Sequence, residues 1–95
     1  MIARSEPLFP LGLILATPAA MEMLEAAQIS PSRFLHRHAS GDWGDLSEED
    51  RRLNDRALRT GERVLSVYRP FDRGTLWIIT EADRSATTLL TPEEY

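Results

Sequence analysis

The first half of this chain carries three closely spaced helix starts, and this spacing limits the fold more than any other feature. Thr17-Pro18 and Ser30-Pro31 each place an N-capping hydroxyl before a proline, whose missing N–H costs nothing at the first helical position. Ser47 precedes three acidic residues, which suit the positive end of a helix dipole. We therefore predict three short helices: Pro18 to about Gln28, Pro31 to the turn at Gly41, and Ser47 to about Thr60, before Gly61.

Strand-like segments lie on both sides of these helices. A short apolar run at Leu11–Thr17 has the length of a buried strand. Runs rich in β-branched and aromatic residues follow at Arg63–Arg69, Thr75–Ala82 and Ala86–Thr91, and turn-like residues at 70–74 and 83–85 join them. These three runs predict an antiparallel meander, which the first strand joins because its backbone groups would otherwise be buried unpaired. The fold class is α+β, β-α-α-α-β-β-β, with helices packed on one face of a small, mainly antiparallel sheet of three to four strands.

The length of 95 residues fits one globular domain, 1–95, in which residues 1–7 are expected to be a flexible N-terminus. No cysteine is present, so disulfides and thiolate metal sites are excluded. Pro7 and Pro10 interrupt the apolar start, and no apolar run approaches the roughly 20 residues that span a bilayer. We expect a cytoplasmic protein that does not enter a membrane.

The charge distribution argues against nucleic acid as the main partner. The formal net charge is -4, and all 11 basic residues are arginine. Six of these arginines fall within Arg51–Arg69 against two acids, which leaves a local basic patch. Favourably ordered pairs such as Glu48–Arg52 explain this patch as a solvated helix face. Nucleic-acid binding through Arg51–Arg69 is therefore allowed but not favoured.

The segment Phe34–Asp45 gathers both histidines and a tryptophan, and it raises the question of a metal or catalytic site. His36 and His38 are two residues apart, so a regular helix places them about 200° around its axis, on opposite faces. They cannot chelate one ion together, and we predict no metal and no cofactor.

His38 and the turn that follows it allow a structural and a functional interpretation. His38 shares a helix face with Phe34 and precedes Asp42 and Trp43. It is either a buried histidine satisfied by Asp42 or a backbone carbonyl, or one half of a His–Asp pair with a tuned pKa. Trp43 either covers the core or stands exposed as an anchor for a protein partner.

The turn between the last two predicted strands is the second candidate binding site. It concentrates polar groups, above all Glu81, Asp83 and Arg84. Asp83 and Arg84 serve either as ordinary turn residues or as groups that recognise a phosphate, a carboxylate or a charged side chain. No nucleophile elbow, phosphate-binding loop or dinucleotide glycine pattern is present.

Three long motifs together resemble a family of short bacterial proteins of unknown function that are described as plasmid-related. The motifs are "LGLILATPAA", "FLHRHASGDWGDLSEED" and "LWIITEADRSATTLLTPEEY", and they cover nearly the whole chain. The helix start in that family is more often "ATPGA", where this chain has Ala19. The resemblance implies an occurrence near restriction genes or mobile elements, but no catalytic role.

Two functional hypotheses follow. The leading one is a non-enzymatic accessory or regulatory module that binds a protein partner, and the sequence also allows a homodimer. The alternative rests on topology, which is similar to that of RelE-like toxins, metal-independent ribonucleases. His38, Arg63, Tyr68 and Arg84 would then be the catalytic residues, although such ribonucleases are usually basic and this chain is not.

Overall fold

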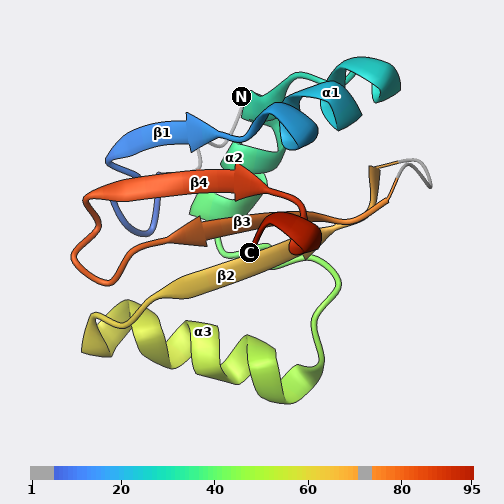
Figure 1. Cartoon of the computed structure of the whole chain (residues 1–95). Coiled ribbons are helices and arrows are strands. Elements are labelled where there is room, and N and C mark those ends of the chain that lie inside the picture. Colours follow the sequence, from blue (N-terminus) through green and yellow to red (C-terminus); the bar gives the residue numbers. More distant parts are fainter. Residues whose placement is uncertain (1–5, 71–73) are drawn as a thin grey trace, which may run out of the picture.

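The computed structural model describes residues 6–70 and 74–95, which have the predicted element order β-α-α-α-β-β-β (Figure 1). The predicted flexible segment 1–7 and the turn at 70–74 lie largely outside the described residues. The elements are β1 (Leu13–Ala16), α1 (Pro18–Ala27), α2 (Pro31–Ala39), α3 (Glu48–Thr60), β2 (Val64–Tyr68), β3 (Leu76–Thr80), β4 (Ala86–Leu90) and a 3-10 helix, η2 (Pro92–Glu94).

The helix ends confirm the predicted capping residues. The side chains of Thr17, Ser30 and Ser47 each accept a hydrogen bond from a backbone N–H in the first turn of α1, α2 and α3. Gly61 follows α3 with a φ of +79°, a left-handed conformation that glycine adopts without steric cost. Local sequence therefore sets where each helix begins and ends.

The four strands form one sheet in the order β1-β4-β3-β2. β2, β3 and β4 make the predicted antiparallel meander, and β1 joins it parallel to β4. In this register Ser66 lies opposite Ile78, and both Ile78 and Ala16 lie opposite Leu89, so these side chains share one face of the sheet.

No helix among the described residues is long and apolar enough to cross a membrane.

Helices α1 and α2 cover that face and build the main core. In Figure 1, α2 lies behind the sheet and α1 lies beyond the end of β1. Leu24 of α1 and Phe34 of α2 pack with sheet residues in one cluster. On this face, the side chains of β2, β3 and β4 are all 2% exposed or less: Val64, Ser66, Tyr68, Leu76, Ile78, Thr80, Thr87 and Leu89. The predicted helix-covered sheet is confirmed here.

Helix α3 lies along the outer edge of β2, below the sheet in Figure 1. Ala57 of α3 packs with Phe9, Trp43 and Val64 in a second cluster. Leu53, although apolar, is 49% exposed on this helix. Asn54 is buried instead, since α3 approaches a strand edge whose backbone groups need polar partners.

The expectation that the first strand is buried is wrong. Leu13, Ile14 and Leu15 of β1 are 64%, 44% and 45% exposed. The physical reason is that β1 lies at the edge of the sheet and contacts only β4 along one side. An apolar run of this length signals a strand but does not distinguish a central strand from an edge strand.

Candidate functional site

His38 lies in the core, where both ring nitrogens are bound by side-chain hydroxyls. Its exposed fraction is 0%, its Nδ1 is 2.6 Å from Ser66 Oγ, and its Nε2 is 2.9 Å from Thr80 Oγ1. The predicted partner Asp42 makes no hydrogen bond to it. That prediction is wrong because His38 points from α2 toward the sheet, whereas Asp42 lies in the turn beyond the helix.

The hydrogen bonds beyond His38 fix which groups donate between Nε2 of the ring and the Leu11 carbonyl oxygen. Thr87 Oγ1 donates to the carbonyl oxygen of Leu11 at 2.7 Å, so its single hydroxyl proton is used. Thr80, 2.7 Å away, must therefore donate to Thr87 and accept from His38 Nε2. Nε2 of His38 therefore carries a proton. Because the pKa of His38 is lowered to about 4, the ring is neutral near pH 7, and Nδ1 then accepts from Ser66. We call this chain from Ser66 through His38, Thr80 and Thr87 to Leu11 the buried relay.

The surroundings of His38 oppose its protonation. Burial, and secondly the positive charge of Arg84, lower its pKa from 6.5 to about 4. Both nitrogens already have partners, and the ring is closed off from solvent by Phe9 and Trp43, whose centroids lie 5.3 and 5.8 Å away. The relay therefore joins α2 to the strands, and it offers no free base to a substrate.

The turn after α2 is held by Asp42. Its carboxylate accepts two hydrogen bonds from Arg37, at 2.7 and 3.3 Å, and one from the backbone N–H of Gly44. The Arg37 guanidinium holds the pKa of Asp42 below its usual range, and the pKa of Arg37 is raised in turn. The carbonyl oxygen of Asp42 accepts a 2.6 Å hydrogen bond from the Tyr68 hydroxyl. Asp42 thus docks the turn onto β2.

Trp43 belongs to the core and is not an exposed anchor. Its side chain is 4% exposed and stacks on Phe9 with a centroid distance of 6.2 Å. Its indole Nε1 donates to Asp55 Oδ1 at 3.0 Å, which ties the turn to α3. Of the two interpretations, the structure therefore supports a Trp43 that covers the core. A partner has little access to this ring.

The turn between β3 and β4 is also occupied by internal bonds. The Asp83 carboxylate accepts a hydrogen bond from the backbone N–H of Ser85, as an aspartate in an ordinary turn does. Asp83 therefore acts here as a turn residue. The guanidinium of Arg84 donates to the carbonyl oxygens of Ala57, Glu62 and Glu81, at 3.0, 2.7 and 3.2 Å. Arg84 thereby closes the carboxyl end of α3 onto the sheet. Glu81, by contrast, has an exposed side chain.

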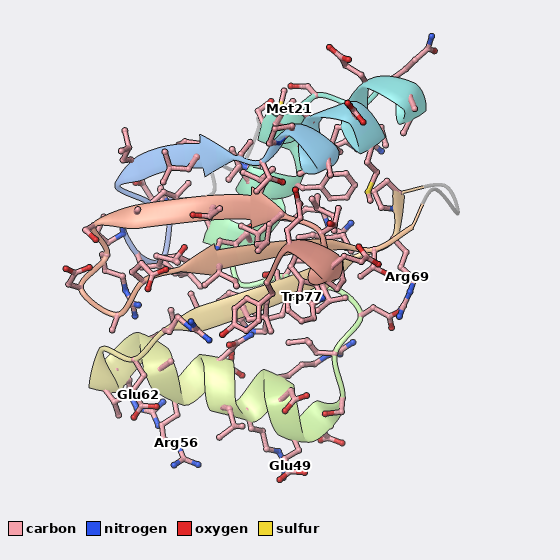
Figure 2. All side chains as sticks on the ribbon, in the orientation of Figure 1. Met21, Glu49, Arg56, Glu62, Arg69 and Trp77 are labelled. Atoms are coloured by element: carbon pink, nitrogen blue, oxygen red, sulfur yellow. The ribbon has the colours of Figure 1, made fainter. Side chains whose placement is uncertain are left out.

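The four residues of the ribonuclease hypothesis do not meet in an open site. His38 and Tyr68 are buried on the helix-covered face, and Arg84 is engaged by carbonyl groups. Arg63 lies on the other side, where it donates to the Tyr95 hydroxyl at 2.5 Å. The Tyr95 ring packs edge to face against Trp77, which Figure 2 places on the face of the sheet toward the viewer. The geometry therefore gives the ribonuclease hypothesis no support.

The two edges of the sheet differ in a way that the sequence does not reveal. At the β2 edge, Asn54 donates to the Leu65 carbonyl oxygen at 2.7 Å and accepts from the Leu65 N–H at 3.2 Å. The backbone of Trp43 and Asp45 does the same for Val67, at 3.0 and 2.7 Å. A side chain and a short loop thus replace a fifth strand, and this edge is closed.

At the β1 edge the outward backbone groups have no partner among the residues that the structure describes. Leu13 and Thr17 donate inward to the carbonyl oxygens of Ser85 and Leu89 on the β4 side. In a parallel ladder the intervening residues Ile14 and Ala16 then direct their N–H and C=O groups away from the sheet. Within 6–70 and 74–95, no hydrogen-bond partner lies on that outer side. The exposed edge of β1 was missed by sequence reasoning, which assigned this run to the interior.

Three arginines form a further site that sequence reasoning did not single out. Arg33 and Arg37 of α2 and Arg69 after β2 line a hollow together with Ile29, Phe34 and Pro70. The i,i+4 spacing of the first two was the available signal, but Arg69 joins them only through the tertiary fold.

Comparisons of the chain with protein-family models, curated proteins and solved structures find no match. The likeness to the plasmid-related family stays a prediction.

Proposed function

We propose that this protein is a non-enzymatic module that binds a protein partner by adding one strand of that partner to the free edge of β1. The observation that carries the proposal is the contrast between the two edges. Asn54 and the Trp43–Asp45 loop saturate the outer edge of β2, whereas the outward groups of Ile14 and Ala16 lack partners among the described residues. An extended segment on β1 would satisfy these groups as an additional strand.

The side chains around this edge indicate the chemistry of the partner segment. Leu13 and Leu15 point to the sheet face opposite α1 and α2, since they lie in register with Ala86 and Thr88. Both are largely exposed, so a partner strand would cover apolar surface as well as satisfy backbone groups. The run Leu11–Ala20 contains no charged residue. A charged strand would lose hydration there without gaining an ion pair, so the segment that fits is uncharged and apolar.

The flanking prolines limit the length of the added strand. Pro10 and Pro18 stand before and after β1, and proline cannot donate to a ladder. The added strand is thus confined to pairing with residues 11–17. Natural edge strands usually carry a lysine, a proline or a bulge that prevents pairing, and β1 itself carries none of these. The link to mobile elements or restriction genes rests on the family resemblance alone and remains part of this proposal.

Substitutions at the edge test the proposal. Leu13→Lys places a charge beside the pairing positions, and Ala16→Pro removes one outward N–H. Leu53→Lys on α3 is the matched control, because it changes another exposed leucine, 49% against 64% for Leu13, away from β1. Each variant and the parent protein would be immobilised and exposed to extract of the native host, after circular dichroism has shown that each is folded.

The expected result is a stoichiometric partner that the parent protein and Leu53→Lys retain and that both β1 variants lose. Hydrogen exchange on the recovered complex should then show slower exchange at the Ile14 and Ala16 amides. A partner that the β1 variants retain, or unchanged exchange at these amides, would contradict the proposal. Light scattering of the pure protein comes first, since a dimer that Leu13→Lys dissociates would identify a second copy as the occupant instead.

A further inference from the structure

The hollow between α2 and the end of β2 is a second feature, independent of the β1 edge and of the function proposed above. It has a volume of about 200 Å³ and is lined by Ile29, Arg33, Phe34, Arg37, Arg69 and Pro70. Figure 2 shows Arg69 at the outer end of β2, away from the edge of β1. We propose that this hollow binds a single carboxylate that carries an apolar group about the size of a benzene ring.

The guanidinium groups supply the recognition of an anion. Arg33 and Arg37 lie one turn apart on α2, and Arg69 approaches from β2. Arg37 is held in place, because its guanidinium carbon lies 4.6 Å from the Tyr68 ring centroid and 5.8 Å from that of Phe34. Its bonds to Asp42 use Nε and Nη2, so the two protons of Nη1 remain available to a ligand. An arginine fixed in this way loses little conformational entropy when it binds.

The charge of the hollow selects a monovalent anion. Arg37 pairs with Asp42 and Arg69 pairs with Asp45, whereas Arg33 has no ion pair with any of the residues that the structure describes. Three positive and two negative side chains leave a net charge of one positive. A carboxylate balances this charge, while a phosphate monoester, at about -1.5 to -2, would exceed it.

The remaining lining is apolar and limits the size of the ligand. Phe34 and Ile29 are both buried, and Pro70 completes this half of the wall. A cavity of about 150 Å³ accepts benzene, so a hollow of this size accepts one ring or a branched aliphatic group. It is smaller than the roughly 300 Å³ at which sites for drug-sized ligands begin, so it holds a group of one ring and not a whole nucleotide. The ligand is therefore a small apolar acid, either free or as the C-terminal residue of a peptide.

Titration with phenylacetate, followed by the backbone amide resonances of the full chain, tests the inference. The amides of Ile29, Arg33, Phe34 and Arg37 should shift together with one saturation curve. Phenylacetamide, which has the same ring and no charge, should bind at least tenfold more weakly, because it forms no charge-assisted hydrogen bond. A peptide ending in a free phenylalanine carboxylate, compared with its amide, distinguishes a peptide terminus from a free acid: tighter binding of the peptide assigns the terminus, and weaker binding assigns the free acid.

Arginine variants locate the binding. Arg33→Ala should weaken phenylacetate binding about tenfold, because it removes the guanidinium that has no acidic partner in the described structure. Arg52→Ala is the control, since Arg52 is exposed on α3 and pairs only with Glu48. The inference is overturned if phenylacetate causes no shift at about 10 mM, if it binds no better than phenylacetamide, or if inorganic phosphate binds more tightly. It is also overturned if Arg33→Ala and Arg52→Ala weaken binding equally.

Discussion

Acid should destabilise this protein through one residue, His38, well before most of its carboxylates titrate. The pKa of His38 is about 4 in the native state, against 6.5 for a free histidine. The unfolded state therefore binds a proton more readily, and the free energy of unfolding falls as the pH drops below 6.5. The stability that this histidine contributes is complete above that value and is lost progressively down to about pH 4.

The size of the effect follows from the two pKa values. A difference of 2.5 units corresponds to about 3 kcal/mol at a pH below both values, and to about 2 kcal/mol between roughly pH 8 and pH 5. Asp42, Asp83 and Glu94 all have lowered pKa values, so their contributions are lost at more acidic pH. The interval from pH 8 to pH 5 thus isolates the histidine.

Urea denaturation at about pH 8 and pH 5 measures the loss, and His38→Gln provides the comparison because glutamine does not titrate. The parent protein should lose about 2 kcal/mol over this interval, and the variant should lose much less. If His38→Gln does not fold, NMR titration of the His38 ring in the parent protein replaces it. A ring midpoint near 6.5, or equal pH dependence in both proteins, would refute the assignment of a neutral His38 in the buried relay.

Four further substitutions, one of them a control, test the packing of the turn after α2 and of the end of α3. Gly44→Ala should cost more than 2 kcal/mol, because its added Cβ would lie within 2.0 Å of the Val67 carbonyl oxygen at a φ of +81°; Gly61→Ala, with open space at a similar φ, should cost only about 1 kcal/mol, and equal losses would contradict the argument. Trp43→Ala should cost about 3–5 kcal/mol in a denaturation experiment, and a loss below about 1 kcal/mol would show that the indole is not a core residue. Arg84→Met should cost about 2 kcal/mol and speed hydrogen exchange at the end of α3, whereas unchanged exchange there would contradict its role in closing that end.

The sequence alone determined the elements of this fold and the boundaries of its helices. The hydroxyl-proline pairs at Thr17 and Ser30, and the cap at Ser47, act within one turn of the chain, so they can be read without any tertiary contact. The alternation of apolar and turn residues after Gly61 likewise sufficed to predict the antiparallel meander.

Only the tertiary structure decided which polar side chains are bonded within the protein and which remain available to a ligand. His38 meets Ser66 and Thr80, residues 28 and 42 positions away, instead of the nearby Asp42, because the helix face and the strand faces align only after folding. Burial of β1 also could not be predicted, since its exposure depends on its place at the edge of the sheet. Local rules describe a residue and its neighbours in the chain, whereas burial and hydrogen-bond partners depend on contacts between distant segments. Both proposed binding sites, the β1 edge and the three-arginine hollow, arise from such contacts.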